Sequence, residues 1–525
     1  MRLIVGAIIL LSFLQVQAKL PPQAQTYLSQ IPGQKLTLPF VIETALKNSD
    51  QYRVVGLQFA QAKIEQEALE SAEDFRFNSS ANYMDNNSAK ASQFQNARDK
   101  QWKWDVGFSK YWATGTKTLI KYQHDWNWAQ LSSAFSNPSS PFSSGGFFLT
   151  NYKQSVGVLG LEQSLLKNSF GYSYRKKREA ARKRGEAITL KTQHDLEQTT
   201  LNFVSLFYEA WLTQQQVASL SDQVARQTKL LRVMRRKAQK GAVEKPELIQ
   251  VEALLASTRS NFEVVKAQLR QKWEALVYGL KLPMEFLPVD PMDIPTQIDD
   301  PVPLGLRVCG LKEPRKTAEI LSLEKNLEAL KADFSAVKNE AYPDLSLKAN
   351  YTGNSIDTSG STTFQQVLSG RDTNGNGLGP MWSVGLVLDW PLDNSKNRAD
   401  RAQKFVEREQ TVSQLQMAKD QLQASWKDLC RQLRVELENE KITSNVVREQ
   451  KKRVKAENRR FSLGRISVSD LVQAEDDLGR WEFSNSQKSV QVRSLAWRVQ
   501  ALSGELFKKI TPAVEAQLDA AEGVL

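Results

Sequence analysis

Histidine and cysteine are scarce in this chain, whose 525 residues include two of each. His124 alternates with aromatic residues and His194 stands in a charged run, and neither lies near a plausible nucleophile or set of metal ligands. No glycine-rich phosphate-binding loop with its lysine precedes a predicted helix. These absences argue against an enzyme and predict neither a cofactor nor a metal.

The two cysteines, Cys309 and Cys430, have no spacing that suits a metal site. An oxidising compartment permits a disulfide between them, but the sequence alone does not pair them. Both the free thiols and the disulfide are compatible with the sequence.

Long apolar runs are missing after the N-terminus. A positively charged start and an apolar run at residues 3–14 precede the small-x-small sequence VQA at residues 16–18. This pattern predicts a secretory signal peptide over residues 1–18, and the next residue is Lys19 rather than the cysteine of a lipoprotein. No later segment approaches about 18 uninterrupted apolar residues, so we expect no transmembrane helix in the mature chain.

Acidic residues are too few to balance the basic ones, and the net charge is +12. Such a balance suggests nucleic-acid binding, but export argues against that partner. Basic clusters occur at residues 175–184 and 232–240. We expect them to be solvated helix faces, because acidic residues are interleaved elsewhere on the same runs; acidic lipid head groups and anionic cargo are the alternatives.

Proline is absent between Pro141 and Pro246 and again over residues 392–511. Residues 170–240 are rich in strong helix formers and predict a helix roughly 100 Å long. Residues 392–463 predict a second one, with an apolar position about every 3.67 residues. These apolar positions form a narrow stripe on one side of the helix, and the stripe requires partner helices along its whole length. It comprises Leu415, Ala418, Leu422, Trp426, Leu429, Leu433 and Leu437.

Short segments in which apolar and polar residues alternate predict β-strands before each long helix. Residues 102–112 and 120–128 form a hairpin around the turn ATGT, and residues 345–351 and 382–390 form a second pair around a polar loop at 352–380. Aromatic crowding at the strand ends favours an outer-membrane β-barrel over a soluble sheet. The expected membrane girdle is Trp102, Trp104, Trp112, Trp126, Trp128, Trp382 and Trp390.

The sequence DTNGNG at residues 372–377 matches the first half of a calcium-binding loop. Ser383 stands where such a loop requires a bidentate acid. We therefore expect an external loop here, with weak calcium binding as the alternative.

The chain repeats itself at a constant offset. Residues 238–255 align with 461–478, so that Gly464 matches Gly241 (464 − 241 = 223) and Asp470 matches Glu247. Glycine suits the left-handed cap at the end of a helix. Ser467 and Asp470 predict a capping box for the next helix, and Pro246 and Glu247 predict an acidic first turn. The packing stripe then resumes at Leu248, Leu255, Leu471 and Leu478.

A proline-rich linker divides these repeats. The predicted layout is a signal peptide at 1–18, a first repeat at 19–282, the linker at 283–303, a second repeat at 304–511 and a tail at 512–525. Each repeat is read as helix, strands, very long helix, glycine turn and long helix.

The duplication, the element order and the two turns GAVEKPELIQVEALL and GRISVSDLVQAEDDL resemble the outer membrane efflux protein (TolC) family. LTLPFVIETALKNSDQYR (residues 36–53) resembles its opening helix, and LGLEQSLLKNSFG (159–171) its passage from strand to helix. The resemblance covers nearly the whole mature chain. It implies a mostly α-helical protein that forms a homotrimer, with one shared outer-membrane β-barrel and a long periplasmic α-helical barrel.

The function implied by the resemblance is a passive exit duct in the outer membrane of a Gram-negative bacterium, extending into the periplasm. It would serve a tripartite efflux or type I secretion system together with an inner-membrane transporter and a periplasmic adaptor, and its barrel would contact outer-membrane lipid. The rival interpretation is a secreted periplasmic coiled-coil structural or adaptor protein.

By the same resemblance, the tip turns line a periplasmic aperture and dock the adaptor. The expected aperture residues are Gly241, Glu247, Gly464, Ser467 and Asp470, and the expected docking residues are Ala242, Val243, Arg465 and Ile466. Capping alone also accounts for Asp470. Two features depart from the family: Glu247 replaces its usual aspartate, and the first repeat offers more than two strands. The extra hairpin belongs either in the barrel or above the membrane.

Overall fold

The computed structural model describes residues 35–90, 95–132, 149–239, 244–286, 294–295, 298–358, 364–370, 379–504 and 506. The chain divides into two compact units, and each unit takes segments from both halves of the sequence. Unit 1 comprises residues 1–60, 188–322 and 415–525, and unit 2 comprises residues 61–187 and 323–414.

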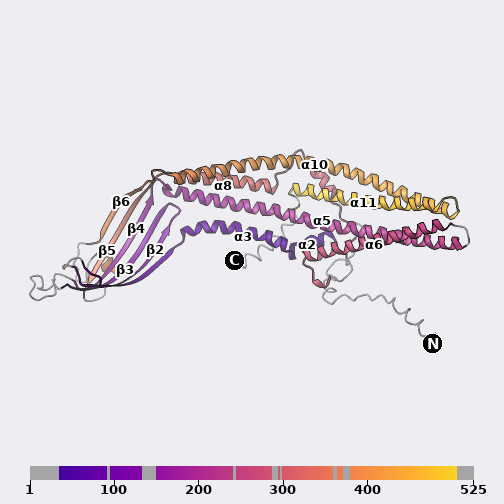
Figure 1. Cartoon of the computed structure of the whole chain (residues 1–525). Coiled ribbons are helices and arrows are strands. Elements are labelled where there is room, and N and C mark those ends of the chain that lie inside the picture. Colours follow the sequence, from indigo (N-terminus) through magenta and orange to yellow (C-terminus); the bar gives the residue numbers. More distant parts are fainter. Residues whose placement is uncertain are drawn as a thin grey trace, which may run out of the picture. The chain divides into compact units, whose positions relative to one another are not determined.

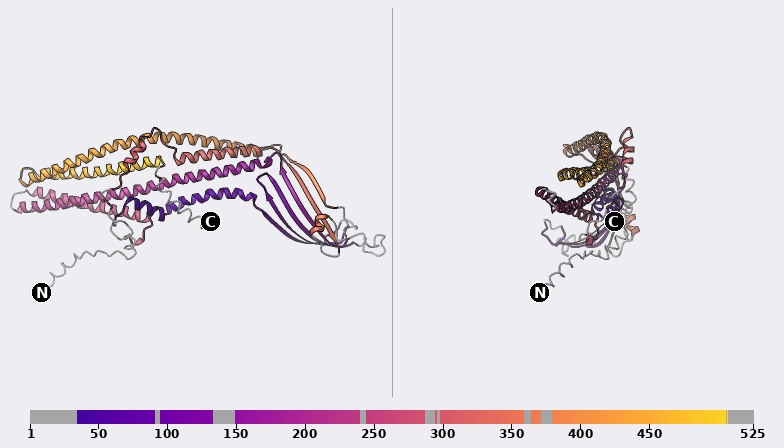
Figure 2. Two further views of the ribbon diagram at one scale, coloured as in Figure 1. Left: turned by 180° about the vertical axis from the view of Figure 1, so that it is seen from behind. Right: turned by 90° about the vertical axis from the view of Figure 1, so that its right-hand side faces the viewer.

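Two helical hairpins of equal length confirm the internal duplication (Figure 1; Figure 2 shows them from behind). Helices α5 (Tyr172–Gln239) and α10 (Ser395–Ser462) have 68 residues each. Their return helices α6 (Lys245–Gly279) and α11 (Val468–Leu502) have 35 each. The bounds of α10 and α11 exceed those of α5 and α6 by the offset found in the sequence (395 − 172 = 223). The predicted long helices are thus confirmed.

Shorter helices precede the strands of each half. The first half has α2 (Leu38–Asn48) and α3 (Asp50–Glu70), and the second has α7 (Val302–Cys309) and α8 (Ala318–Glu340). The expected single opening helix is in fact broken at Ser49, whose ψ of 132° is extended. The remaining short elements are the 3₁₀ turns η2 (Ser71–Glu73), η3 (Ser169–Gly171) and η4 (Met284–Phe286), and the helix α9 (Phe364–Ser369).

The main core of unit 1 is aromatic. Tyr52, Phe203, Phe207 and Tyr208 are almost fully buried between α2, α3, α5 and α6. The Tyr208 hydroxyl accepts a hydrogen bond of 3.1 Å from the Trp497 indole of α11, and the Tyr52 hydroxyl lies 2.6 Å from the Thr200 hydroxyl, so both tyrosine hydroxyls of this core are paired.

A second cluster of unit 1 covers the predicted apolar stripe of α10. Leu433 is fully buried, and Trp426, Leu429 and Leu437 pack against residues of α7 and α11. The stripe therefore has the partner helices that its narrow width requires.

Unit 2 contains a six-stranded antiparallel sheet in the order of the sequence, β1-β2-β3-β4-β5-β6. Its strands are β1 (Arg76–Asn86), β2 (Arg98–Tyr111), β3 (Thr116–Gln130), β4 (Asn151–Ser164), β5 (Asp344–Asp357) and β6 (Met381–Asp389). Four strands come from the first half and two from the second. The predicted hairpin is β2–β3, and it lies inside this sheet between β1 and β4.

The structure corrects the loop expected at residues 352–380. Thr352 to Asp357 continue strand β5, because they pair with Lys153 to Val158 of strand β4. Helix α9 follows, and its Val367 packs against Gly157, where an added Cβ would lie 3.2 Å from the valine side chain. The predicted calcium-loop residues 372–377 lie outside the described residues.

The first basic cluster is ion-paired rather than simply solvated, which corrects the expectation from the sequence. Lys183 pairs with Glu328 of α8 at 2.9 Å and Arg178 with Glu70 of α3 at 2.9 Å. Arg184 pairs with the largely buried Asp333. These contacts join three helices of unit 2.

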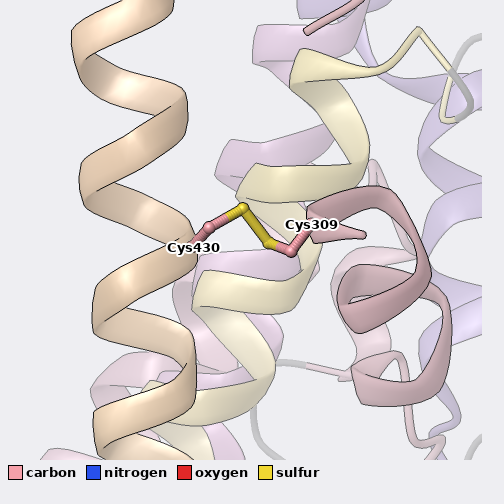
Figure 3. The surroundings of a disulfide bond; sticks show 2 residues. All are labelled: Cys309 and Cys430. Carbon is pink, nitrogen blue, oxygen red and sulfur yellow. A yellow bond between two sulfur atoms is a disulfide. The ribbon is translucent and has the colours of Figure 1, made fainter. Parts of the chain in front are cut away.

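Cys309 of α7 and Cys430 of α10 form a disulfide (Figure 3). Their Cα atoms are 5.6 Å apart, and the bond spans 121 residues of sequence. Both cysteines are buried in the cluster that covers the α10 stripe. The disulfide therefore fastens a short helix to the middle of a long one within unit 1.

Removing this disulfide with Cys309→Ser and Cys430→Ser should lower the free energy of unfolding of unit 1 by about 2 to 5 kcal/mol, because a long loop is no longer closed in the unfolded chain. Chemical unfolding in detergent, followed by tryptophan fluorescence, measures this loss. Reductant should destabilise the wild type and leave the double variant unchanged. Equal stability of the two proteins without reductant would contradict the prediction.

Candidate functional site

The turn between α10 and α11 caps both helices that it joins. Gly464 has φ of +71°, the left-handed conformation in which a side chain is strained. Its N–H bonds to the Phe461 carbonyl at 3.0 Å, and the Arg465 N–H bonds to the Arg460 carbonyl at 2.9 Å. This pair of bonds is a Schellman cap, which ends α10 and satisfies its last carbonyls.

The predicted capping box starts α11. The Asp470 N–H donates to the Ser467 hydroxyl oxygen at 3.2 Å, and the Ser467 N–H donates to the Asp470 carboxylate at 3.1 Å. The Ser467 hydroxyl bond, followed by the backbone bond, lowers the pKa of the Asp470 carboxyl. Asp470 is therefore an exposed, ionised group held in one orientation at the tip.

The equivalent turn between α5 and α6 is described only from Glu244 onward. Glu244 is extended at the N-cap and makes no side-chain capping bond, with Pro246 and Glu247 in the first turn of α6. The predicted acidic first turn is present. Gly241, Ala242 and Val243 lie outside the described residues.

An apolar cluster joins the tips of the two hairpins. It contains Leu230, Leu231 and Met234 of α5, Val251 and Leu255 of α6, Phe461 of α10, and Val468 and Leu471 of α11. The Lys237 ammonium of α5 lies 4.7 Å from the centre of the Phe461 ring. The four helices therefore meet next to Glu247 and Asp470, and Ile466 and Leu248 pack at the edge of the cluster.

Sequence reasoning missed a polar cluster between α5 and α11, which lies farther from the tip than the apolar cluster. Gln223 of α5 donates to Asp476 of α11 at 2.9 Å. Its neighbour Glu475 is 4% exposed. Burial raises the pKa of the Glu475 carboxyl, while the positive charge of Arg226 acts in the opposite direction. The repeat aligns Glu475 with Glu252, but no local pattern indicates that only Glu475 becomes buried.

One face of the sheet in unit 2 is apolar and exposed. A continuous row of directly paired residues crosses all six strands. The row consists of Phe77, Phe108, Ile120, Leu159, Tyr351 and Trp382, all at least 36% exposed. Val384, Leu386 and Leu388 continue the same face along β6 and are exposed too. A surface of this extent is a site for an apolar partner.

The opposite face is polar. Asp105 accepts a hydrogen bond from Ser80 at 2.8 Å and pairs with Lys121 at 3.2 Å, and Gln154 donates to Asn354 at 3.0 Å. The alternation along each strand therefore separates an apolar from a polar surface, as predicted.

The seven tryptophans of the predicted girdle all belong to the sheet or its ends. Trp102 lies directly opposite Trp126, and Trp112 and Trp390 follow the last residues of β2 and β6. Six of the seven are exposed, and Trp104 is half-buried against His124. The assignment of these residues to a membrane girdle stays a prediction.

No group of three histidine, cysteine or acidic side chains in the described segments could hold a metal ion. Among the helices that the structure describes, none has the length and hydropathy to cross a bilayer.

Comparison with known proteins gives a consistent match. Residues 316–498 match the sequence profile of the outer membrane efflux protein family. No curated protein matches the chain. Matching solved structures include the outer membrane channel CmeC of Campylobacter jejuni, with 14% identity and a TM-score of 0.62 over 91% of this chain and 89% of that one.

Two further channels are similar over most of their length. VceC of Vibrio cholerae has 12% identity and a TM-score of 0.60, covering 90% of this chain and 95% of its own. MtrE of Neisseria gonorrhoeae, in its open state, has 14% identity and a TM-score of 0.58, covering 89% of each chain. The fold expected for one chain, mostly helical with a β-sheet, is confirmed. The chain as a whole has the fold of these outer membrane channels, and its residues 316–498 are similar to the outer membrane efflux protein family.

Proposed function

We propose that this protein is the outer-membrane exit duct of an efflux system, a passive conduit driven by an inner-membrane transporter through a periplasmic adaptor. The observation that carries the proposal is the apolar, exposed face of the six-stranded sheet in a chain with two helical hairpins of equal length. Strands can cross lipid only in a closed barrel, because every backbone group must be paired.

The edges of the sheet support closure by copies of the same chain. Nearly every residue of β1 and every residue of β6 is exposed. Successive strands alternate in direction, so β1 and β6 run in opposite directions and can pair as antiparallel neighbours between copies. A homotrimer of six-stranded sheets would then close a barrel of 18 strands, a size that leaves an aqueous channel.

In this arrangement the apolar face of the sheet meets outer-membrane lipid and the polar face lines the channel. The exposed tryptophans would stand at the two boundaries of the membrane, where their apolar rings and polar N–H groups are both accommodated. Cation–π contacts of Lys110 with Trp112 and of Lys100 with Trp128 fit that position.

The sheet predicts opposite outcomes for two neighbouring residues of β6. Leu386→Arg places a charge on the lipid-facing side and should cost about 2 to 4 kcal/mol of barrel stability, which reduces the amount of assembled trimer. Val387→Arg is the matched control on the polar face and should assemble normally. Membrane fractionation followed by light scattering in mild detergent measures location and mass.

A detergent-dependent trimer in the outer membrane, reduced by Leu386→Arg alone, is the expected result. Equal tolerance of both arginines in an outer-membrane trimer would refute the assignment of the faces. A water-soluble monomer or dimer would overturn the duct itself and favour the secreted coiled-coil alternative.

Glu247 and Asp470 are proposed to form a cation-preferring ring of carboxylates at the periplasmic aperture, with Gly241, Gly464 and Ser467 shaping its turns. The motivating observation is that Asp470 is exposed and fixed in orientation by Ser467. The neighbouring Ala242, Val243, Arg465 and Ile466 are proposed to contact the adaptor.

The capping box makes it possible to separate charge from structure. Glu247→Gln with Asp470→Asn removes both charges and leaves an amide oxygen that can accept the Ser467 N–H. Ser467→Ala keeps the charges and removes the cap, at about 1 kcal/mol. Reversal potentials in planar bilayers should show lower cation preference in the first variant and unchanged preference in the second. Unchanged selectivity in a folded Gln/Asn variant would refute the aperture role.

Buried Glu475 gives the contact between α5 and α11 a pH dependence. Its folded-state pKa lies above the ordinary value of 4.5, so the folded state retains a proton that the unfolded state releases. The contact should therefore lose stability as the pH rises from about 4.5 through the raised pKa.

Glu475→Gln should reduce this loss, because the amide cannot ionise. Hydrogen exchange of residues 223–236 and 461–475 at pH 5 and pH 8 gives the free energy of local opening. The wild type should open more easily at pH 8 than at pH 5, and Glu475→Gln should differ less between the two. Glu252→Gln, the more exposed counterpart in the repeat, is the control and should behave like the wild type. An identical pH dependence in Glu475→Gln would contradict the prediction.

A further inference from the structure

Each descending helix carries a stripe of three exposed cations near its tip. Lys229, Arg232 and Arg236 form the α5 stripe, and Lys452, Lys455 and Arg459 form the α10 stripe; all six residues are exposed. The spacing of three and then four residues puts the cations of each stripe on one helix face. The members of the two stripes match one to one at the repeat offset (452 − 229 = 223).

The cations are present at matching positions in both halves of the chain, although the residues between them differ. Met234 and Arg235 of α5 stand where α10 has Glu457 and Asn458. Packing does not account for the stripe on α5, because at 100° per residue its cations lie on the side opposite to the buried Leu230 and Met234.

The cations are largely free of acidic partners. Lys452 pairs with Glu449 of its own helix at 2.9 Å. Lys229, Arg232, Arg236, Lys455 and Arg459 form no ion pair with any residue that the structure describes. In contrast, the first basic cluster of the sequence is matched by acidic residues of α3 and α8. Five of the six cations in the two stripes therefore carry positive charge that no ion pair among the described residues compensates.

Neighbouring helices do not cover the stripes. The α5 stripe stays exposed although α5 already contacts both α6, through Arg235 and Glu252, and α11, through Gln223 and Asp476. The α10 stripe likewise stays exposed although α10 contacts α11 through Lys451 and Glu482 and through Arg453 and Asp477.

An exposed apolar side chain continues the α10 stripe. Leu463 follows Arg459 by four residues, at the end of α10, and is 61% exposed. A charged rim beside an apolar contact is typical of a protein interface and is not needed to hold a soluble anion.

We propose that the α5 and α10 stripes are docking surfaces for a helical protein partner whose contacting face carries acidic residues three and four positions apart. This inference rests on the proposed duct function and specifies the chemistry of its periplasmic partner. Both stripes lie near the tip ends of α5 and α10, next to the turns that lead into the return helices (Figure 1). Acidic side chains on that face would steer the partner and fix its register.

The test uses two designed helical hairpins as probes, one with glutamates three and four residues apart and one with glutamines there. Binding to the purified full-length trimer is measured by fluorescence anisotropy at low and high salt. The acidic hairpin should bind, and salt should weaken it. The triple variants K229E/R232E/R236E and K452E/K455E/R459E should each bind it at least about tenfold more weakly.

The matched control is K427E/R431E/R434E, which reverses three exposed cations of α10 with the same kind of spacing farther from the tip. It preserves the ion-pair context too, since Arg431 pairs with Asp428 as Lys452 pairs with Glu449. This control should bind the acidic hairpin like the wild type. A hairpin with lysines in place of glutamates should regain binding to the two stripe variants.

Several outcomes would overturn the inference. The acidic hairpin could bind all variants equally, or fail to bind a conducting outer-membrane trimer. The stripe variants could instead change the ion selectivity of conductance without affecting hairpin binding, which would place the stripes in the lumen. The stripe variants could also bind the acidic hairpin normally and lose only their binding to phosphatidylglycerol vesicles, which would assign the stripes to lipid. The mass, location and conductance of the wild type test the duct function separately.

Discussion

A helix of 68 residues with one narrow apolar stripe is stable only where other helices cover that stripe. In unit 1 the return helices α6 and α11 cover much of it, and α7 covers the middle of α10 and is fastened there by the disulfide. Because each return helix starts within a few residues of the turn, the tip must end one helix and begin the next at once. The Schellman cap and the capping box meet that requirement.

A single copy leaves two kinds of surface without a packing or pairing partner. Strands β1 and β6 have exposed edges, and α10 exposes Val435 and Ile442, whose residue type suits a helix interface. The two needs arise in different units, yet association with further copies would satisfy both. In the proposed trimer, folding and assembly would therefore be thermodynamically linked, and the isolated chain would be the less stable form. Where the two hairpins meet, burial of Glu475 opposes ionisation of its carboxyl.

Local signals in the sequence predicted much of this structure. Helix formers and the absence of proline gave the long helices to within three residues, alternation gave the faces of β2 and β3, and Ser467 with Asp470 gave the capping box. Features that depend on distant residues were not accessible. Gly353 to Ser355 have weak strand propensity, and pairing with β4 overrides it. The pairing of Cys309 with Cys430 and the burial of Glu475 depend on how helices far apart in sequence pack. The domain boundaries and the roles of the tip residues stay predictions.

The equal lengths of the two hairpins constrain how the sequence can change. One inserted residue in α5 would rotate its tip by about 100° and advance it by about 1.5 Å relative to α10. The apolar cluster at the tips would then lose its register, since it takes residues from all four helices. A tolerated insertion or deletion in one half must therefore be matched in the other, or occur in multiples that restore the helical phase. The two halves can diverge in residue type while their lengths remain tied together.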